Sequence, residues 1–221
     1  MPPRVLKADQ HESISEAAKV IMAGGVVAVP TESFYGLAVN ALDERAVERL
    51  LAIKKRREDH PVLILIPSAE VLGRYVAQIP AVALRLTETF WPGGLTLVFM
   101  AKPALPLLLT GGTGKIGVRL SSHPVPTQVA GVAGVAITGT SANVTGEPPC
   151  EKPEEVFKTL GSQVDIILDG GKTAGGRGST VLDVTVAPPV ILREGMVSRK
   201  LLTPFFQSHR PAHSPQSARS G

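Results

Sequence analysis

Four short segments of the chain concentrate the hydroxyl, amide and cationic side chains that bind polar ligands. They read PTESFYGL at residues 30–37, KKR at 54–56, TSAN at 140–143 and GSTVLD at 178–183. Each lies at the end of an apolar run, and none holds a cysteine, a histidine or paired carboxylates at its centre. These residue types favour a pocket that holds polyanionic and small polar ligands over one that attacks its ligand with a protein nucleophile.

Four cations lie at the ends of predicted helices or strands, where an open α/β sheet places its ligands: Lys54, Arg56, Arg119 and Arg193. A guanidinium offers a planar fork to phosphate or carboxylate, and an ammonium offers a compact charge. Together they suit a nucleoside triphosphate whose pyrophosphate must leave. The alternative for Lys54 and Arg56 is a solvated helix end, since cations favour a helix C-terminus.

Short polar side chains accompany these cations. Hydroxyls and amides suit a carboxylate, a hydroxyl or a ribose. The alternative is capping and turn formation, which explains most residues of these types. Only the joint pattern favours a binding role. The side chains concerned are Thr31, Ser141, Asn143, Ser179 and Thr180.

Length and composition predict one domain. The chain has 221 residues, of which 43% are hydrophobic and 19% charged, enough apolar surface for one substantial core. We predict this domain over residues 1–202 and a disordered, basic, proline- and serine-rich tail over 203–221. The tail has Arg210 and Arg219 but no acid, so the formal charge of +4 falls to +2 without it. Affinity for anions must therefore come from a local patch.

The expected compartment is the cytoplasm. The single cysteine, Cys150, cannot form an intramolecular disulfide, and no CxxC pattern suggests zinc. The N-terminus lacks the charged start and apolar stretch of a secretory signal. No apolar run approaches the length needed to cross a bilayer, so we expect no membrane association.

Strands and helices alternate along the chain, which predicts an α/β domain. Several strands are joined by loops instead of helices, so the sheet should be mixed, with helices flanking it. Ser13 and Glu16 resemble a capping box, and Asp43 can cap a second helix that ends at the KKR segment. The predicted strands are residues 26–29, 62–66, 95–99, 116–120, 135–138, 164–168, 180–184 and 190–193, and the other predicted helices are 71–76, 82–90, 125–132 and 153–160.

Two segments look like catalytic motifs without meeting their requirements. The loop TGGTGK at 110–115 lacks the first glycine of a phosphate-binding loop and the serine or threonine after its lysine. The segment GTSAN at 139–143 has Asn143 where a nucleophile elbow needs its second glycine. The Ser141 hydroxyl is therefore interpreted as a hydrogen-bonding group.

The motifs as a set resemble the YrdC-like domain of threonylcarbamoyl-AMP synthases. The resemblance runs from about Ile14 to Leu202, and its most specific signatures are K-x-R at 54–56 and S-x-N at 141–143. It implies a twisted, mostly mixed α/β sheet with flanking helices and a concave, positively lined cavity. The segments that carry it are PTESFYGLA, KKR, PGGLTLV, GVRL, TSAN, STVLDV and ILREG.

The resemblance also implies a reaction and its partners. Members of this family are nucleotidyltransferases that convert L-threonine, bicarbonate or CO2 and ATP into L-threonylcarbamoyladenylate and pyrophosphate. Magnesium would accompany the ATP. The product serves the threonylcarbamoyladenosine modification of tRNA, so a threonylcarbamoyl transferase machinery is an expected partner.

Site residues carry over position by position from the resemblance. Around threonine it places Thr31, Arg119 and Ser179, and around ATP it places Lys54, Ser141 and Arg193, with Arg56 and Asn143 completing the two signatures. The catalytic set is then Lys54, Arg56, Ser141 and Asn143. We assign Arg119 to the threonine carboxylate, and Lys54 with Arg56 to the phosphates. No residue is predicted to bind a metal directly, and Glu32 and Asp183 are interpreted as structural in preference to water-mediated metal contacts.

Departures from the family pattern and two alternatives stay open. Arg57 and Ser121 stand where the family often has proline, and Leu65 where many members are polar, which affects the shape of the threonine pocket. One alternative function is a non-catalytic module that binds double-stranded RNA or tRNA, although 4% aromatic residues argue against base stacking. The other is carbamoyl transfer to a partner protein, for which the chain lacks the length and the cysteines.

Overall fold

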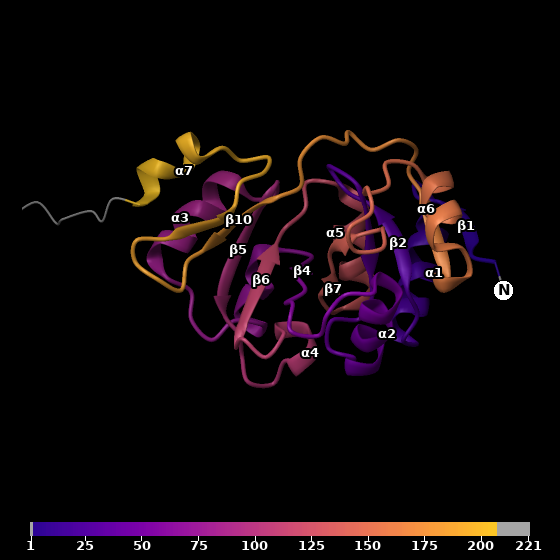
Figure 1. The fold of residues 1–221 in the computed structure, drawn as a ribbon, viewed down its shortest axis with the longest axis horizontal. Helices are drawn as coiled ribbons and strands as arrows, with labels where there is room; N and C mark the ends of the chain where they lie inside the picture. The colour runs from indigo at the N-terminus through magenta and orange to yellow at the C-terminus, as the bar shows by residue number, and fades with distance from the viewer. Residues whose placement is uncertain (1, 207–221) are drawn as a thin grey trace, which may run out of the picture.

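The structure is a computed structural model that describes residues 2–206, whose strands form two sheets (Figure 1). The five-stranded sheet has the order β1 (Arg4–Lys7), β9 (Ile166–Asp169), β2 (Val27–Pro30), β3 (Tyr35–Ala38) and β8 (Thr140–Ser141). The six-stranded sheet has the order β11 (Val190–Arg193), β10 (Thr180–Asp183), β5 (Leu95–Met100), β6 (Lys115–Arg119), β4 (Ile64–Leu65) and β7 (Ile137–Thr138).

Both sheets are mixed. In the first, β9 is parallel to β1 and β2, whereas β3 is antiparallel to β2 and β8. In the second, β5 is parallel to β10 and antiparallel to β6. An isolated bridge between Asn40 and Ile137 connects the two sheets where β3 and β7 approach each other. The predicted mixed α/β class is therefore confirmed, with two sheets in place of one.

Helices flank the sheets and divide the core in two. One cluster of buried side chains packs α1 and α5 against β2 and β9, and a larger one packs α2, α3 and α6 against both sheets. Strand β2 alternates between them, since Val27 and Val29 belong to the smaller cluster and Ala28 to the larger. Strand β2 is thus covered on both faces. The helices are α1 (His11–Met22), α2 (Glu44–Lys54), α3 (Ala81–Phe90), α4 (Leu107–Thr110), α5 (Pro124–Ala133), α6 (Pro153–Leu160) and α7 (Arg199–Phe206), with 3-10 turns at Ala69–Arg74 and Gly161–Gln163.

Two helix starts were predicted from capping residues, and one of the two predictions is correct. Helix α2 begins after Asp43, whose carboxylate accepts hydrogen bonds from the backbone of Arg45 and Ala46, as predicted. The capping box at Ser13 was wrong, because α1 already begins at His11 and Ser13 is buried on its inner face. The apolar spacing after Ser13 is helical, but it extends one turn further back than the capping pattern indicates.

The segment after β2 is a hairpin turn and not a free strand exit. Residues 31–34 form the turn, and the chain returns as β3, which pairs Pro30 with Tyr35 and Val27 with Ala38. The two-residue strand β8 then pairs with β3 at Gly36 and Leu37. The predicted strand at 62–66 is shortened to Ile64–Leu65. Strands β1, β3 and β8 were not predicted.

The last described helix extends past the predicted domain boundary at residue 202. Helix α7 continues through Pro204 to Phe206, and the Phe205 ring lies 5.6 Å from the ring of Phe90 on α3. Packing against α3 thus orders a segment whose proline had suggested a tail. The rest of the predicted tail lies outside the described residues.

Among the helices of residues 2–206, none combines the length and hydropathy that crossing a bilayer requires.

Candidate functional site

A cavity of about 820 Å³ lies between the two sheets. One wall is formed by the turn after β2, the start of β3, and β8 with the loop after it. The opposite wall is one face of the six-stranded sheet, because alternate residues of its strands line the cavity. These residues are Thr96 and Val98 on β5, Lys115, Gly117 and Arg119 on β6, and Ser179, Val181 and Asp183 along β10.

Seven of the eight predicted site residues line this cavity, although they come from segments far apart in the chain. They are Thr31, Arg56, Arg119, Ser141, Asn143, Ser179 and Arg193. The eighth, Lys54, lies behind the wall. Most of the predicted site residues therefore lie together at one cavity. The roles assigned to the individual residues stay predictions.

Lys54 fixes the S-A-N turn from behind. It is 2% exposed, and its Nζ donates to the carbonyl oxygens of Ser141 (2.5 Å) and Asn143 (2.8 Å) and to Asn143 Oδ1 (3.2 Å). An ammonium has three hydrogens, so its donors are fully used by protein oxygens. Burial, assisted by the charge of Arg56, lowers the pKa of Lys54 to about 8. This placement differs from the expected direct contact with phosphates and gives Lys54 a positioning part.

The S-A-N turn presents its polar atoms to the cavity in a fixed arrangement. Ser141 Oγ donates to Asn143 Oδ1 at 2.5 Å, and Asn143 Nδ2 donates to the carbonyl oxygen of Glu147 at 2.6 Å. The Oδ1 atom thus accepts from both Ser141 and Lys54. This network locks the asparagine side chain, and the two lone pairs of Ser141 Oγ remain available as acceptors.

Arg56 reaches the cavity because the helix ends abruptly before it. Lys55 adopts the left-handed conformation with φ of 48°, which turns the chain out of α2. Arg56 Nη2 donates to the carbonyl oxygen of Pro61 at 2.7 Å, while its buried Nε has no hydrogen-bond partner among the described residues. Burial and the nearby charge of Arg193 lower the pKa of Arg56. Two guanidiniums that disfavour each other are stabilised when an anion lies between them.

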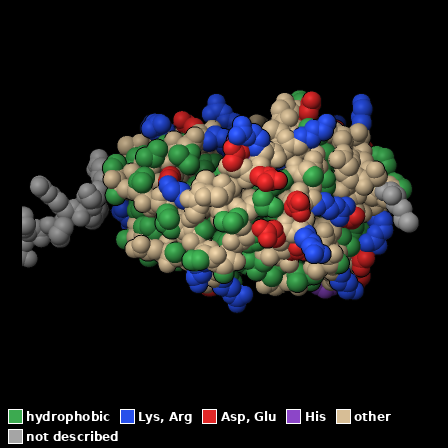
Figure 2. All heavy atoms as spheres, turned by 60° about the horizontal axis from the view of Figure 1, so that its bottom comes forward, with side chains coloured by type: hydrophobic (Ala, Val, Ile, Leu, Met, Phe, Trp, Pro, Cys, Tyr) green, Lys and Arg blue, Asp and Glu red, His purple; other side chains and the backbone are tan. Residues whose placement is uncertain are grey.

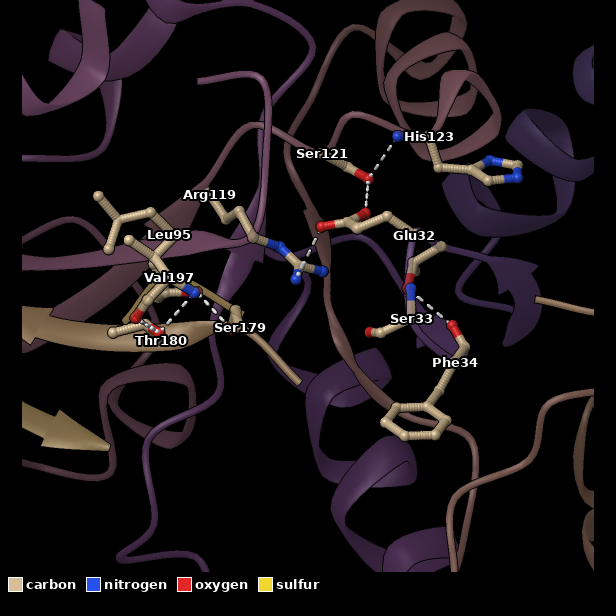
Figure 3. Close-up of polar contacts among 12 residues, drawn as sticks. Glu32, Ser33, Phe34, Leu95, Arg119, Ser121, His123, Ser179, Thr180 and Val197 are labelled. Carbon is tan, nitrogen blue, oxygen red and sulfur yellow. Dashed lines mark hydrogen bonds and ion pairs between the residues drawn. The ribbon is translucent and has the colours of Figure 1, made fainter. Parts of the chain in front are cut away.

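Arg119 forms a buried ion pair with Glu32 (Figure 3). Its Nη1 lies 3.1 Å from Glu32 Oε1, and the two side chains are 5% and 9% exposed. The second carboxylate oxygen accepts from Ser121 Oγ at 2.5 Å, and Ser121 Oγ accepts in turn from the backbone amide of His123 at 3.2 Å. Burial lowers the pKa of Arg119, although Glu32 opposes this. Both carboxylate oxygens of Glu32 thus contact protein groups, while its structural role stays a prediction.

Arg119 Nε is buried and has no hydrogen-bond partner among the described residues. An unsatisfied buried donor on a charged group costs free energy that a bound carboxylate could recover. This geometry fits the predicted assignment of Arg119 to a substrate carboxylate.

Ser179 and Arg193 are joined at the start of β10. Arg193 Nη2 donates to the Ser179 carbonyl oxygen at 2.9 Å and contacts Ser179 Oγ at 3.3 Å. Thr96 Oγ1 donates to the same hydroxyl at 2.9 Å. In the turn after β2, Thr31 Oγ1 donates to the Phe34 carbonyl oxygen at 2.7 Å and accepts from the Ser33 amide at 3.3 Å. Both hydrogen bonds stabilise the turn.

Sequence reasoning missed several polar residues of the cavity, among them Thr96, Lys115 and Arg177. Lys115 was set aside with the rejected phosphate-loop pattern. Counting back from Arg119 in steps of two would have found it, because β6 places both residues on one face. Arg177 lies in a glycine-rich loop that has no periodicity to follow.

The cavity gathers positive charge, although residues 1–202 together carry a formal charge of only +2. Its lining has two acids, Asp183 and Glu194, and five cationic side chains: Arg56, Lys115, Arg119, Arg177 and Arg193. Asp183 forms an ion pair with Lys115 at 2.8 Å. Within residues 2–206 no three His, Cys, Asp or Glu side chains are grouped so that they could hold a metal ion. The predicted local patch for anions is therefore present.

Comparison with known proteins identifies relatives over most of the chain. The Sua5/YciO/YrdC family, described as "Telomere recombination", matches residues 19–195. A threonylcarbamoyl-AMP synthase of Pyrococcus abyssi is 40% identical over 179 residues, which are 81% of this chain and 53% of that protein. The chain therefore spans about half the length of this relative.

Solved structures agree. P. abyssi Sua5 complexed with L-threonine superposes with a TM-score of 0.87 at 36% identity, over 91% of this chain and 60% of the other. E. coli YciO superposes with a TM-score of 0.80 at 29% identity, over 91% of this chain and 97% of the other. The second comparison covers nearly the whole of a protein of similar extent.

Proposed function

Because the chain belongs to the Sua5/YciO/YrdC family, we propose that it forms L-threonylcarbamoyladenylate and pyrophosphate from L-threonine, bicarbonate or CO2 and ATP. The product would serve the threonylcarbamoyladenosine modification of tRNA in the cytoplasm, through a transferase that accepts it. One observation carries the proposal: Arg56, from the chain just after α2, and Arg119 and Arg193, from two strands of the six-stranded sheet, converge on a single cavity. A site for two anionic reactants needs such convergence.

The buried and the more exposed cations of the cavity would bind different substrates. Arg119 is buried at the wall of the cavity and would hold the threonine carboxylate, with Thr31 and Ser179 near it. Arg56 and Arg193 would hold the phosphates, and the S-A-N turn would contact the nucleotide. In this arrangement the threonine amine faces the α-phosphate.

The chemistry needs no protein nucleophile. The neutral amine adds to CO2 and releases a proton to solvent to give a carbamate, and a carbamate oxygen attacks the α-phosphorus. The new oxygen–phosphorus bond replaces the bond to the β-phosphate, and pyrophosphate leaves with the electron pair of the bridging oxygen. The protein mainly orients two anions and neutralises the charge that develops during transfer.

Magnesium would enter as part of the ATP substrate. Oxygen ligands suit this ion, but both acids of the cavity are already engaged. Asp183 accepts from Lys115 and Thr185, and Glu194 Oε1 accepts from the backbone amide of Arg199 at 3.0 Å. The side chains alone therefore do not fit a resident Mg²⁺, and its ligands would be phosphate oxygens and water.

An RNA-binding module without activity has less support. Figure 2 shows basic and acidic side chains interspersed on the face it displays, where RNA binding would favour a gathered basic surface. The cations gather instead in a cavity of about 820 Å³, a size typical of small-molecule sites. Double-stranded RNA is contacted over an extended surface.

A turnover assay tests the proposal. Purified protein is incubated with ATP, labelled bicarbonate and L-threonine, and AMP-linked product and pyrophosphate are measured. We expect turnover that requires threonine, is lost in Arg56→Ala and Arg119→Ala, and is kept in Arg74→Ala, an exposed arginine outside the cavity. Absence of product with the wild-type protein, combined with RNA affinity indifferent to ATP and threonine, would favour the RNA-binding alternative.

A further inference from the structure

The loop from Gly170 to Gly178 connects the last strand of the five-stranded sheet, β9, to β10 of the other sheet, and it arches over the molecule in Figure 1. Its first half is firmly held. Tyr35 Oη donates to the Gly171 carbonyl oxygen at 2.8 Å, and the Gly175 amide donates to the Ser33 carbonyl oxygen at 2.7 Å. Both anchors belong to the PTESFYGL segment, so the loop is tied to the cavity wall opposite β10.

Arg177 follows these anchors and lines the cavity. Its side chain makes no hydrogen bond or ion pair with any residue in the described part of the chain. The other four cations of the cavity each contact a protein oxygen: Arg56, Lys115, Arg119 and Arg193. Arg177 is therefore the cavity cation, within residues 2–206, whose charge is not shared with any protein oxygen.

The backbone around Arg177 is suited to bringing it onto a ligand. Gly176 has φ of 83° with open space where a Cβ would stand, so glycine is favoured there and the turn meets no neighbour. On the other side, a Cβ at Gly178 would lie 3.7 Å from Nη2 of Arg193. Arg177 thus projects from backbone directly beside Arg193, a residue we assign to the phosphates.

Exposure separates the two ends of the cavity. Arg119 at the threonine end is 4% exposed, whereas Arg177 and Arg193 are exposed at the mouth. If threonine lies at the buried end, the α-phosphate must face it, and the β- and γ-phosphates point toward the mouth. The terminal phosphates are therefore the part of ATP that comes within reach of Arg177.

We propose that Arg177 binds the β- and γ-phosphates of ATP and neutralises pyrophosphate as it leaves, a role that rests on the function proposed above. When the carbamate oxygen bonds to the α-phosphorus, the electron pair of the broken bond passes to the β-phosphate oxygen. A guanidinium can contact two phosphate oxygens at once and favours this charge. The single loop carrying it also links the two sheets that enclose the substrates.

Binding measurements with four ligands test this role. Calorimetry with pyrophosphate, a non-hydrolysable ATP analogue, AMP and L-threonine is performed on the wild type, Arg177→Ala, Arg177→Lys and the control Arg74→Ala. We expect Arg177→Ala to weaken pyrophosphate and the analogue roughly tenfold, as for one lost charge-assisted contact. AMP and threonine affinities should stay within about twofold, Arg177→Lys should lie between, and Arg74→Ala should match the wild type.

Two results would overturn the role. Unchanged pyrophosphate affinity in Arg177→Ala would show that the side chain does not reach the terminal phosphates. Equal losses for pyrophosphate, AMP and threonine would show that the substitution distorts the loop. The proposed function fails separately: pyrophosphate affinity that depends on Arg177, in a wild-type protein that forms no threonylcarbamoyl-AMP, leaves the phosphate site and removes the synthase.

Discussion

Arg119 Nη1 and Glu32 Oε1 lie 3.1 Å apart in a setting where both side chains are nearly excluded from water. Removing one member of such a pair leaves a buried charge without a partner, which typically costs about 3–5 kcal/mol of stability. We therefore expect Glu32→Ala and Arg119→Ala each to lower the free energy of unfolding strongly, as measured by urea denaturation. The double variant Glu32→Ala with Arg119→Ala should lie closer to the wild type than the two single losses added together. Additive losses would show that the pair is not coupled.

Ser121 adds a hydrogen bond to Glu32 that proline at this position could not donate. Ser121→Ala removes the 2.5 Å contact from the carboxylate that positions Arg119. We expect threonine affinity to fall severalfold, about 1 kcal/mol for a lost hydrogen bond, with ATP affinity unchanged. Ser121→Thr keeps a hydroxyl and is the matched control. Calorimetric titration with each ligand separates the two effects, and an equal change for threonine and ATP would contradict this positioning role.

Asp43 stabilises α2, the helix that carries Lys54 and Arg56 at its end. Its carboxylate caps the backbone amides of Arg45 and Ala46. Asp43→Ala should lower the free energy of unfolding by about 1 kcal/mol, while Asp43→Asn, which also caps helices well, should lose less. Both variants should keep wild-type affinity for the ATP analogue, because the cap lies at the opposite end of the helix. A loss of stability as large in the asparagine variant would argue against the capping bond.

Local patterns predicted the elements better than their ends. The Asp43 cap and the apolar strand before Pro30 follow from local residue patterns alone. Strand β8 did not, because two residues carry no period and the strand exists only by pairing with Gly36 and Leu37. Packing on Phe90 likewise orders Phe205 beyond a boundary that proline and serine had suggested.

The candidate site shows the same limit at the level of side chains. Polar residue types at segment ends indicated which residues meet at the cavity, and seven of eight do. Sequence could not show that Lys54 points away from it, because the carbonyl oxygens that bind it belong to residues 141 and 143, almost ninety positions later. Arg177 was not predicted because an exposed arginine between glycines lies in no periodic pattern that would mark it as a site residue.

The buried ammonium of Lys54 should make ligand affinity depend on pH. Its pKa of about 8 means that raising the pH from 7 to 9 removes most of its positive charge. Affinity for a non-hydrolysable ATP analogue should then fall roughly fivefold, about 1 kcal/mol, because Lys54 holds the turn that faces the nucleotide. Lys54→Met should show a lower affinity that is flat over this range, and exposed Lys102→Met should behave as the wild type.

Stability should respond to the same titration with the opposite sign. The pKa of Lys54 is lowered in the folded state from 10.5 to about 8, so between these values the unfolded chain binds more protons. The contribution of Lys54 to the free energy of unfolding therefore increases as the pH is raised from 8 to 10.5. It is lost again as the pH falls through 8. Tyr35, whose pKa burial raises to about 12, acts above pH 10 in wild type and variant alike, so it cancels in their difference. We expect the stability of the wild type relative to Lys54→Met to rise from pH 8 to 10 in urea denaturation. A constant difference would mean that Lys54 keeps its ordinary pKa, and the loss of nucleotide affinity above pH 8 should then vanish with it.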